Sequence, residues 1–140
     1  MIATLQVLTV VFAVIAALIH VLIFVMESIL WPTPSTWRRF GLRSQSDADV
    51  VEPMAFNQGF YNLFLAIGTG LGLYLLSSGN AMGGKWVLLV TLSSMVLASV
   101  VLMISSRRLW RAALIQGVAP LLAVVFLLWA VAAHAPLMVI

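Results

Sequence analysis

The sequence has no cysteine and few charged side chains among its 140 residues. Only 8% of the residues are Asp, Glu, Lys or Arg, whereas 64% are hydrophobic. The missing cysteine excludes a disulfide scaffold and a metal site built on thiolates. Soluble domains have about 25% charged and about 45–50% apolar residues, so this composition excludes an ordinary water-soluble enzyme.

Motifs of familiar enzymes and nucleic-acid-binding proteins are also missing. The sequence has no Gly-rich phosphate loop and no His-Glu-x-x-His pair, and no hydrophobic run holds two carboxylates for acid–base catalysis. The two histidines lie too far apart along the chain to predict a haem or zinc site. The arginines are spread over separate loops and form no continuous patch. We therefore expect no metal, no cofactor and no nucleic-acid partner.

Four hydrophobic runs are long enough to cross a lipid bilayer. A helix that crosses about 30 Å of hydrocarbon needs about 20 largely apolar residues. The sequence therefore predicts an all-α polytopic membrane protein, an up-down bundle of four transmembrane helices in one domain of residues 1–140. The longest connecting loop, 31–53, is too short for a separate soluble domain. The predicted spans are residues 5–30, 54–76, 86–104 and 110–133.

The loops differ strongly in positive charge, which predicts the orientation of the bundle. The second loop has only Lys85, whereas the first and third loops contain all the arginines. Lys and Arg collect in cytoplasmic loops. We therefore expect a protein of the inner (cytoplasmic) membrane, with the first and third loops in the cytoplasm and both termini outside. The arginines are Arg38, Arg39, Arg43, Arg107, Arg108 and Arg111.

Tryptophans near the ends of the spans agree with these boundaries. Trp31 ends the first span, and indole rings prefer membrane interfaces, where the N–H stays hydrated. Residues 35–40 could form a short interfacial helix with Trp37 and Phe40 among the lipid headgroups. A solvated linker is the alternative interpretation of this segment.

Two polar side chains interrupt the first span. A charged side chain near the centre of a membrane helix costs about 2.5–3.5 kcal/mol on insertion scales, so it tends to face the bundle interior. Glu27 lies about one turn inside the predicted cytoplasmic end of the span. His20 precedes it by two helical turns and falls on nearly the same helix face. We expect both side chains to point into the bundle.

Amide side chains are frequent where the second and fourth spans begin. They are Asn57, Gln58 and Asn62, with Tyr61 beside them, and Gln116 in the fourth span. A rise of 1.5 Å per residue places them at about the depth of Glu27. The sequence therefore predicts a polar pocket open to the cytoplasm, with Tyr61, Phe24 and Phe60 in its walls. The alternative is that the amides only join helices through hydrogen bonds of about 0.6 kcal/mol each. The predicted ligand-binding or proton-handling residues are Glu27, His20, Asn57, Gln58, Tyr61, Asn62 and Gln116.

Gly68 and Gly72 form a small-residue pair in the second span. This spacing permits close approach of another helix, either within the bundle or in a homo-oligomer. Gln58-Gly59 in the second span and Gln116-Gly117 in the fourth span also suggest an internal two-helix repeat.

Several segments together resemble a known family. His20 and Glu27 precede Trp31, residues 57–66 read Asn-Gln-Gly-Phe-Tyr-Asn-Leu-Phe-Leu-Ala, and residues 116–120 read Gln-Gly-Val-Ala-Pro. This pattern resembles the small bacterial membrane proteins of the domain of unknown function 1304, over nearly the whole chain. The resemblance implies a compact protein with four spans and assigns no catalytic residue.

Three functions are compatible with these features. The first is binding or transport of a small amphiphile or a proton through the polar pocket, with Glu27 as the titratable group. The second is a membrane-embedded enzyme that acts on a lipid-soluble substrate. The third is a structural or accessory subunit that packs through Gly68 and Gly72. Beyond the lipid bilayer, the expected partners are therefore a small hydrophobic or amphiphilic ligand, or a second copy of the chain.

Overall fold

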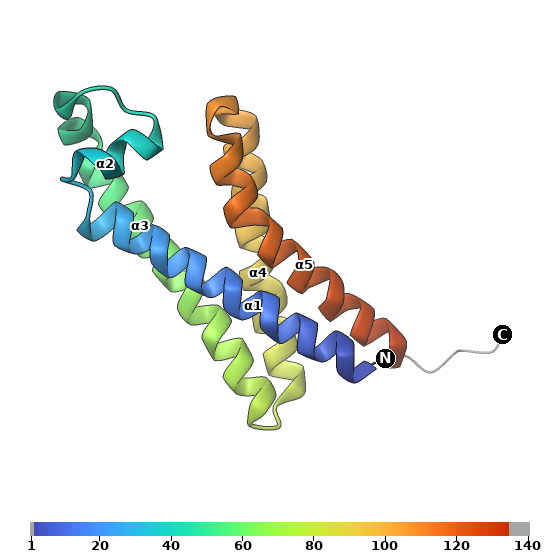
Figure 1. Ribbon diagram of the computed structural model, residues 1–140. Helices are drawn as coiled ribbons and strands as arrows, with labels where there is room; N and C mark the ends of the chain where they lie inside the picture. The colour runs from blue at the N-terminus through green and yellow to red at the C-terminus, as the bar shows by residue number, and fades with distance from the viewer. Residues whose placement is uncertain (1, 135–140) are drawn as a thin grey trace.

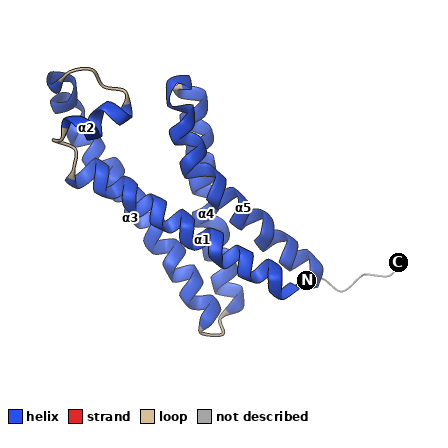
Figure 2. Cartoon of the chain, viewed as in Figure 1, coloured by secondary structure: helices blue, strands red, loops and turns tan. Residues whose placement is uncertain are grey.

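The computed structural model describes residues 2–134, which form helices and connecting loops without any strand (Figure 2). Four helical segments are long and apolar enough to cross a membrane, so the predicted all-α membrane bundle is confirmed. The elements are α1 (Ile2–Phe24), a π-helical turn (Val25–Ile29), α2 (Pro34–Trp37), a 3-10 turn (Arg38–Phe40), α3 (Gln45–Ser77), α4 (Ala81–Ser105), a second 3-10 turn (Arg107–Leu109) and α5 (Trp110–His134).

Each long helix packs along two neighbours, in the cyclic order α1, α3, α4, α5. The helices cross, so their pairing differs between the two ends of the bundle (Figure 1). At the end with α2 and the α4–α5 connection, which we call the arginine end, α1 pairs with α3 and α4 pairs with α5. At the opposite end, which we call the turn end, α1 pairs with α5 and α3 pairs with α4. We call the α1/α3 pair the first arm and the α4/α5 pair the second arm.

The core lies at the waist where the two arms cross. Ala13 and Ala16 of α1 are fully buried there, as are Leu88, Leu92 and Met95 of α4. Small side chains on α1 thus leave room for large side chains on α4, which fill the centre of the bundle. The waist is therefore filled by closely packed, buried side chains. The helix pairs diverge from it toward both ends of the bundle.

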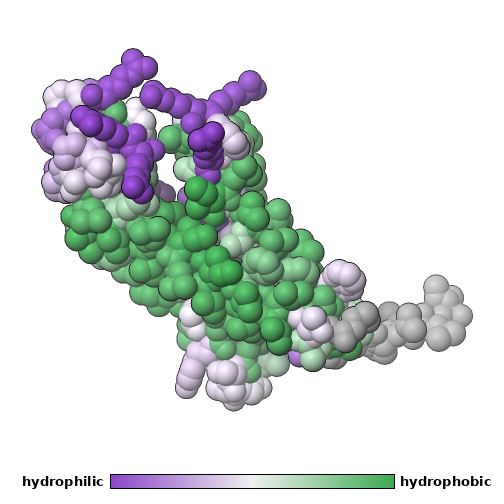
Figure 3. Space-filling view, in the orientation of Figure 1, coloured by the Kyte–Doolittle hydropathy of each residue, from purple (hydrophilic) through white to green (hydrophobic). Residues whose placement is uncertain are grey.

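The surface has a hydrophobic middle and a hydrophilic arginine end. The space-filling view shows apolar residues around the middle of the bundle and strongly hydrophilic residues on the tips of both arms, with a cleft between these tips (Figure 3). This distribution is the one expected when lipid surrounds the middle and water surrounds the tips. The loops that contain the arginines lie at the same end of the bundle.

Helix α3 begins earlier than the sequence predicted. It starts at Gln45, where the Oγ atom of Ser44 accepts a hydrogen bond of 3.1 Å from the Asp47 backbone N–H. Such an N-cap satisfies one of the free N–H groups of the first turn. Pro53, the last residue of the predicted loop, lies inside the helix instead. The predicted loop of residues 31–53 is therefore partly helical.

The segment after α1 folds over the start of α3 with a small core of its own. Trp31 and Trp37 are buried against Ala48 and Ala55, and the Trp31 Nε1–H donates to the Ala48 carbonyl at 3.0 Å. Of the two interpretations of residues 35–40, the structure has the short helix, as α2 and the 3-10 turn that follows it. The expected exposure of Trp37 is wrong, because the ring packs against protein and remains only 3% exposed.

Helix α3 passes close to α4 at two glycines. A Cβ atom on Gly68 would lie 2.7 Å from Thr91 Cγ2, and one on Gly72 would lie 2.8 Å from Leu88 Cγ. A Cβ atom on Gly70 would meet nothing within 4 Å. Gly68 and Gly72 thus lie on the face of α3 that packs against α4 within the chain.

Candidate functional site

Glu27 lies in a π-helical turn that ends the first membrane-spanning segment. The turn covers Val25–Ile29 and closes with a hydrogen bond of 2.8 Å from the Leu30 N–H to the Val25 carbonyl. Single π turns inside helices are rare and occur frequently at functional sites, because the extra residue rotates side chains out of the regular register. Glu27 is only 8% exposed, so the turn directs its carboxyl group into the protein.

Asn62 of α3 holds the Glu27 carboxyl group. Its Nδ2 atom donates to Glu27 Oε2 at 3.0 Å and also to the Gln58 carbonyl at 3.0 Å. Both amide hydrogens are therefore used, one toward the acid and one toward its own helix. In the described part of the chain no Lys or Arg forms an ion pair with Glu27. The carboxyl group thus keeps acceptor sites for a further donor or for its own proton.

Ser28 and Gly59 bring the two helices close enough for this contact. The Ser28 hydroxyl donates to the Phe56 carbonyl at 2.9 Å. A Cβ atom on Gly59 would collide with Ser28 Oγ and approach Glu27 Cβ to 3.1 Å. Any side chain at position 59 would push α3 away from Glu27. The one signal of this role in the sequence is a glycine beside the amides.

His20 is buried deeper in the first arm, with 1% exposure. Its Nδ1–H donates to the Ala16 carbonyl at 2.9 Å, which leaves Nε2 of the neutral ring as an acceptor. The seven residues that separate it from Glu27 correspond to about 10 Å along the helix. Within residues 2–134 no hydrogen bond joins the two side chains. Both nevertheless face the protein interior.

The structure does not gather all the predicted residues around Glu27. Asn57 and Gln58 have exposed side chains, and Tyr61 is 61% exposed, because the face of α3 that carries Gly59 and Asn62 is the one that packs on α1. Tyr61 therefore does not form the inner wall expected for it. Gln116 lies on α5, half-buried, in the other arm. The structure thus brings together the Glu27 carboxyl group, the Asn62 amide and the backbone carbonyl of Gln58.

The aromatic residues expected beside the site do lie next to one another. Phe24 precedes the π turn and Phe60 follows Gly59, and their ring centroids are 5.1 Å apart in an edge-to-face arrangement. Phe60 also contacts Phe56 and Phe64, at 5.0 Å and 6.2 Å. Phe56, Phe60 and Phe64 therefore form a row of aromatic rings along one face of α3.

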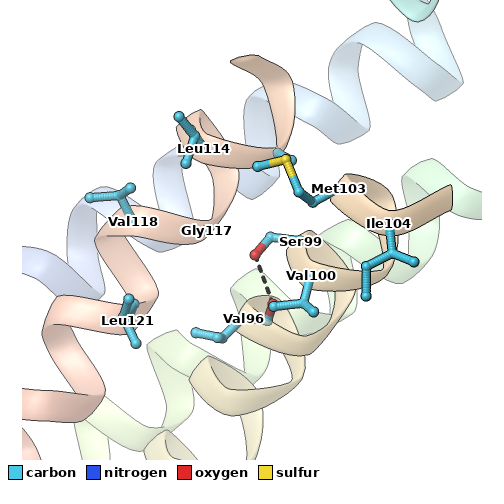
Figure 4. A pocket seen from close by; sticks show the side chains of 10 residues that line it. Val96, Ser99, Val100, Met103, Ile104, Leu114, Gly117, Val118 and Leu121 are labelled. Atoms are coloured by element: carbon cyan, nitrogen blue, oxygen red, sulfur yellow. Dashed lines mark hydrogen bonds between the residues drawn. The ribbon is translucent and has the colours of Figure 1, made fainter. Parts of the chain in front are cut away.

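A separate apolar cavity of about 240 Å³ lies between α4 and α5. Figure 4 shows Leu114, Val118 and Leu121 of α5 on one side and Val100 and Ile104 of α4 on the other. The one hydroxyl group in its lining, that of Ser99, donates to the Val96 carbonyl at 2.7 Å. This cavity therefore offers only packing surface and is not the predicted polar pocket.

The two Gln-Gly pairs occupy similar positions in the two arms. A Cβ atom on Gly59 of α3 would collide with the Ser28 hydroxyl, and a Cβ atom on Gly117 of α5 would collide with the Ser99 hydroxyl. In each arm a glycine of the later helix thus allows close contact with a serine of the earlier segment, Ser28 in the first arm and Ser99 in the second. Only the first arm adds an acid, because Glu27 precedes Ser28 whereas Ala98 precedes Ser99.

Among the described residues, no three His, Cys, Asp or Glu side chains are placed so that they could hold a metal ion. No curated protein and no solved structure matches the chain. The family described as "Protein of unknown function (DUF1304)" matches residues 14–128, a range that includes Glu27, Asn62 and both Gln-Gly pairs. The chain therefore belongs to the DUF1304 family, as the pattern of its polar residues indicated.

Proposed function

We propose that this membrane protein binds or transports a small amphiphile or a proton at a polar site around Glu27. The observation that carries the proposal is a buried carboxyl group near the end of a membrane-spanning segment whose described partner is a neutral amide. Such a group is costly in lipid, and packing alone does not need it. An acid with one neutral donor is suited to take up a proton or a donor group of a ligand.

The surroundings of Glu27 support this role. The π turn and the Gly59–Ser28 contact fix the carboxyl group against α3 at the arginine end. At the same end the tips of the two arms are separated by a cleft (Figure 3). The half-buried amide of Gln116 lies on the second arm. We propose that a ligand enters between the arms and meets Glu27 on one side and Gln116 on the other.

The orientation follows from the arginines. Five of the six lie in the two connections at the arginine end, and Arg111 lies in the first turn of α5 beside them. The positive-inside rule favours the cytoplasm of a cell with an inner membrane for this end. Both termini would then lie outside. The site would open toward the cytoplasm, and the packed waist would separate it from the outside.

Proton movement tests the first form of the proposal. The purified chain is placed in liposomes that contain a pH-sensitive dye, and a potassium gradient with valinomycin drives proton entry. We expect proton uptake with the parent chain, none with Glu27→Gln, and reduced uptake with Asn62→Leu. Asn57→Leu is the matched control, because it removes an exposed amide of the same helix and should leave uptake unchanged.

Ligand binding tests the second form. Decylubiquinone, an uncharged amphiphile with hydrogen-bonding oxygens, should raise the unfolding temperature of the parent chain in detergent more than that of Glu27→Gln. The proposal fails if neither proton uptake nor stabilisation by the quinone depends on Glu27. A Glu27→Leu chain that is more stable than the parent and retains both properties would instead support a structural subunit.

A further inference from the structure

A second cavity lies at the turn end, far from Glu27. Its volume is about 460 Å³, and all four long helices contribute to its lining. Ligand pockets for small molecules have volumes of about 300–1,000 Å³. Val10, Leu73, Leu76 and Leu127 give it an apolar wall, so most of its surface suits a hydrocarbon chain.

Some of the polar side chains that line this cavity form hydrogen bonds within the protein, and others do not. The Thr9 hydroxyl donates to the Leu5 carbonyl at 2.9 Å, and the Ser77 hydroxyl donates to the Tyr74 carbonyl at 2.8 Å. The side chains of Lys85 and Gln6 also line the cavity, and within the described residues neither forms a hydrogen bond or an ion pair. A cation and an amide are therefore available at the edge of an apolar space.

No acidic side chain neutralises Lys85. The four acidic residues of the chain all lie toward the arginine end, in the π turn or the first turns of α3. The carboxyl end of α3 and the amino end of α4 lie side by side at the turn end, so their helix dipoles oppose each other. Among the described residues that line the cavity, Lys85 has the one charged side chain.

We propose that this cavity binds an amphiphile with an anionic head group, which Lys85 and Gln6 contact, and an apolar chain that lies between the helices. Two sources could supply this chemistry, a fatty-acid carboxylate or a phospholipid phosphate. The site is independent of Glu27, because the packed waist of Leu88, Leu92 and Met95 lies between them.

Binding of dodecanoate tests the proposal. Its affinity for the full chain is measured by titration calorimetry in a non-ionic detergent at about pH 9, where the fatty acid is ionised. Dodecanol, with the same chain and no charge, should bind about tenfold more weakly or worse. A short-chain phosphatidylglycerol distinguishes the two sources, since the tighter of the two anionic probes identifies the preferred head group.

Substitutions locate the binding. Lys85→Gln should weaken dodecanoate binding about tenfold, Lys85→Arg should restore it, and Ala81→Leu should weaken it by filling the cavity. Arg108→Gln removes the same charge at the arginine end and should have no effect. Equal affinities for dodecanoate and dodecanol, or an Arg108→Gln chain that loses as much affinity as Lys85→Gln, would overturn the proposal.

Discussion

Replacement of Gly72 by alanine should destabilise the bundle, whereas the same replacement at Gly70 should not. Both glycines lie inside α3, so each substitution gains the same helix preference of about 0.5–1 kcal/mol. A Cβ atom on Gly72 would lie 2.8 Å from Leu88 Cγ and 3.1 Å from the Leu88 backbone nitrogen, whereas one on Gly70 would meet nothing within 4 Å.

The difference between the two variants isolates the packing cost. Leu88 has 0% exposure and cannot swing aside, so α4 itself must shift to admit the methyl group. Overpacking of this kind costs about 1–3 kcal/mol. We therefore expect Gly72→Ala to be less stable than Gly70→Ala by about 1–3 kcal/mol.

Unfolding of both variants in mixed micelles with increasing sodium dodecyl sulfate measures this difference. Circular dichroism at the helical band follows the loss of structure, and each variant is compared with the parent chain. Equal stabilities of the two variants would refute the close contact between α3 and α4, and with it the crossing of the arms at the waist.

Three further substitutions test the segment between α1 and α3. Ser44→Ala removes the cap that accepts the Asp47 N–H and should lower stability by about 0.5–2 kcal/mol in the same unfolding assay, and an unchanged stability would contradict the early start of α3. Trp31→Phe removes the N–H that donates to Ala48 and should cost about 0.5–1.5 kcal/mol beyond the lost volume. Trp37→Phe removes a buried N–H that has no partner in the described part of the chain, so its cost should be smaller. A larger loss of stability for Trp37→Phe than for Trp31→Phe would contradict the hydrogen bonding described for this segment.

Composition and run length were sufficient to predict the four membrane helices. The start of α3 was not predictable in this way, because a proline in a sequence usually marks a helix boundary, and Pro53 lies inside the helix here. The burial of Trp37 also depended on tertiary structure, since the same indole ring satisfies either a membrane interface or a small protein core. These features depend on packing partners that a local pattern does not specify.

Part of the candidate site was predictable from the sequence, and the rest depended on how the helices pack. The cost of an acid in lipid indicated that Glu27 faces the interior, and helical spacing placed amides at its depth, of which Asn62 is its partner. Depth along the helices says nothing about their crossing, so the sequence could not show that Gln116 lies on the other arm. The cavity beside Lys85 also results from the crossing, and its sequence signal was a single lysine at the edge of a span.

The position of the Glu27 carboxyl group is tested most directly by its reactivity with two carbodiimides. The protein in liposomes is treated with an apolar or a water-soluble reagent, and the modified acids are identified by mass spectrometry. Glu52, which is exposed at the start of α3, is the internal reference. We predict that the apolar reagent modifies Glu27 and that the water-soluble reagent modifies Glu52 much faster than Glu27. Modification of Glu27 by the water-soluble reagent as rapidly as Glu52 would contradict a carboxyl group held inside the bundle by Asn62.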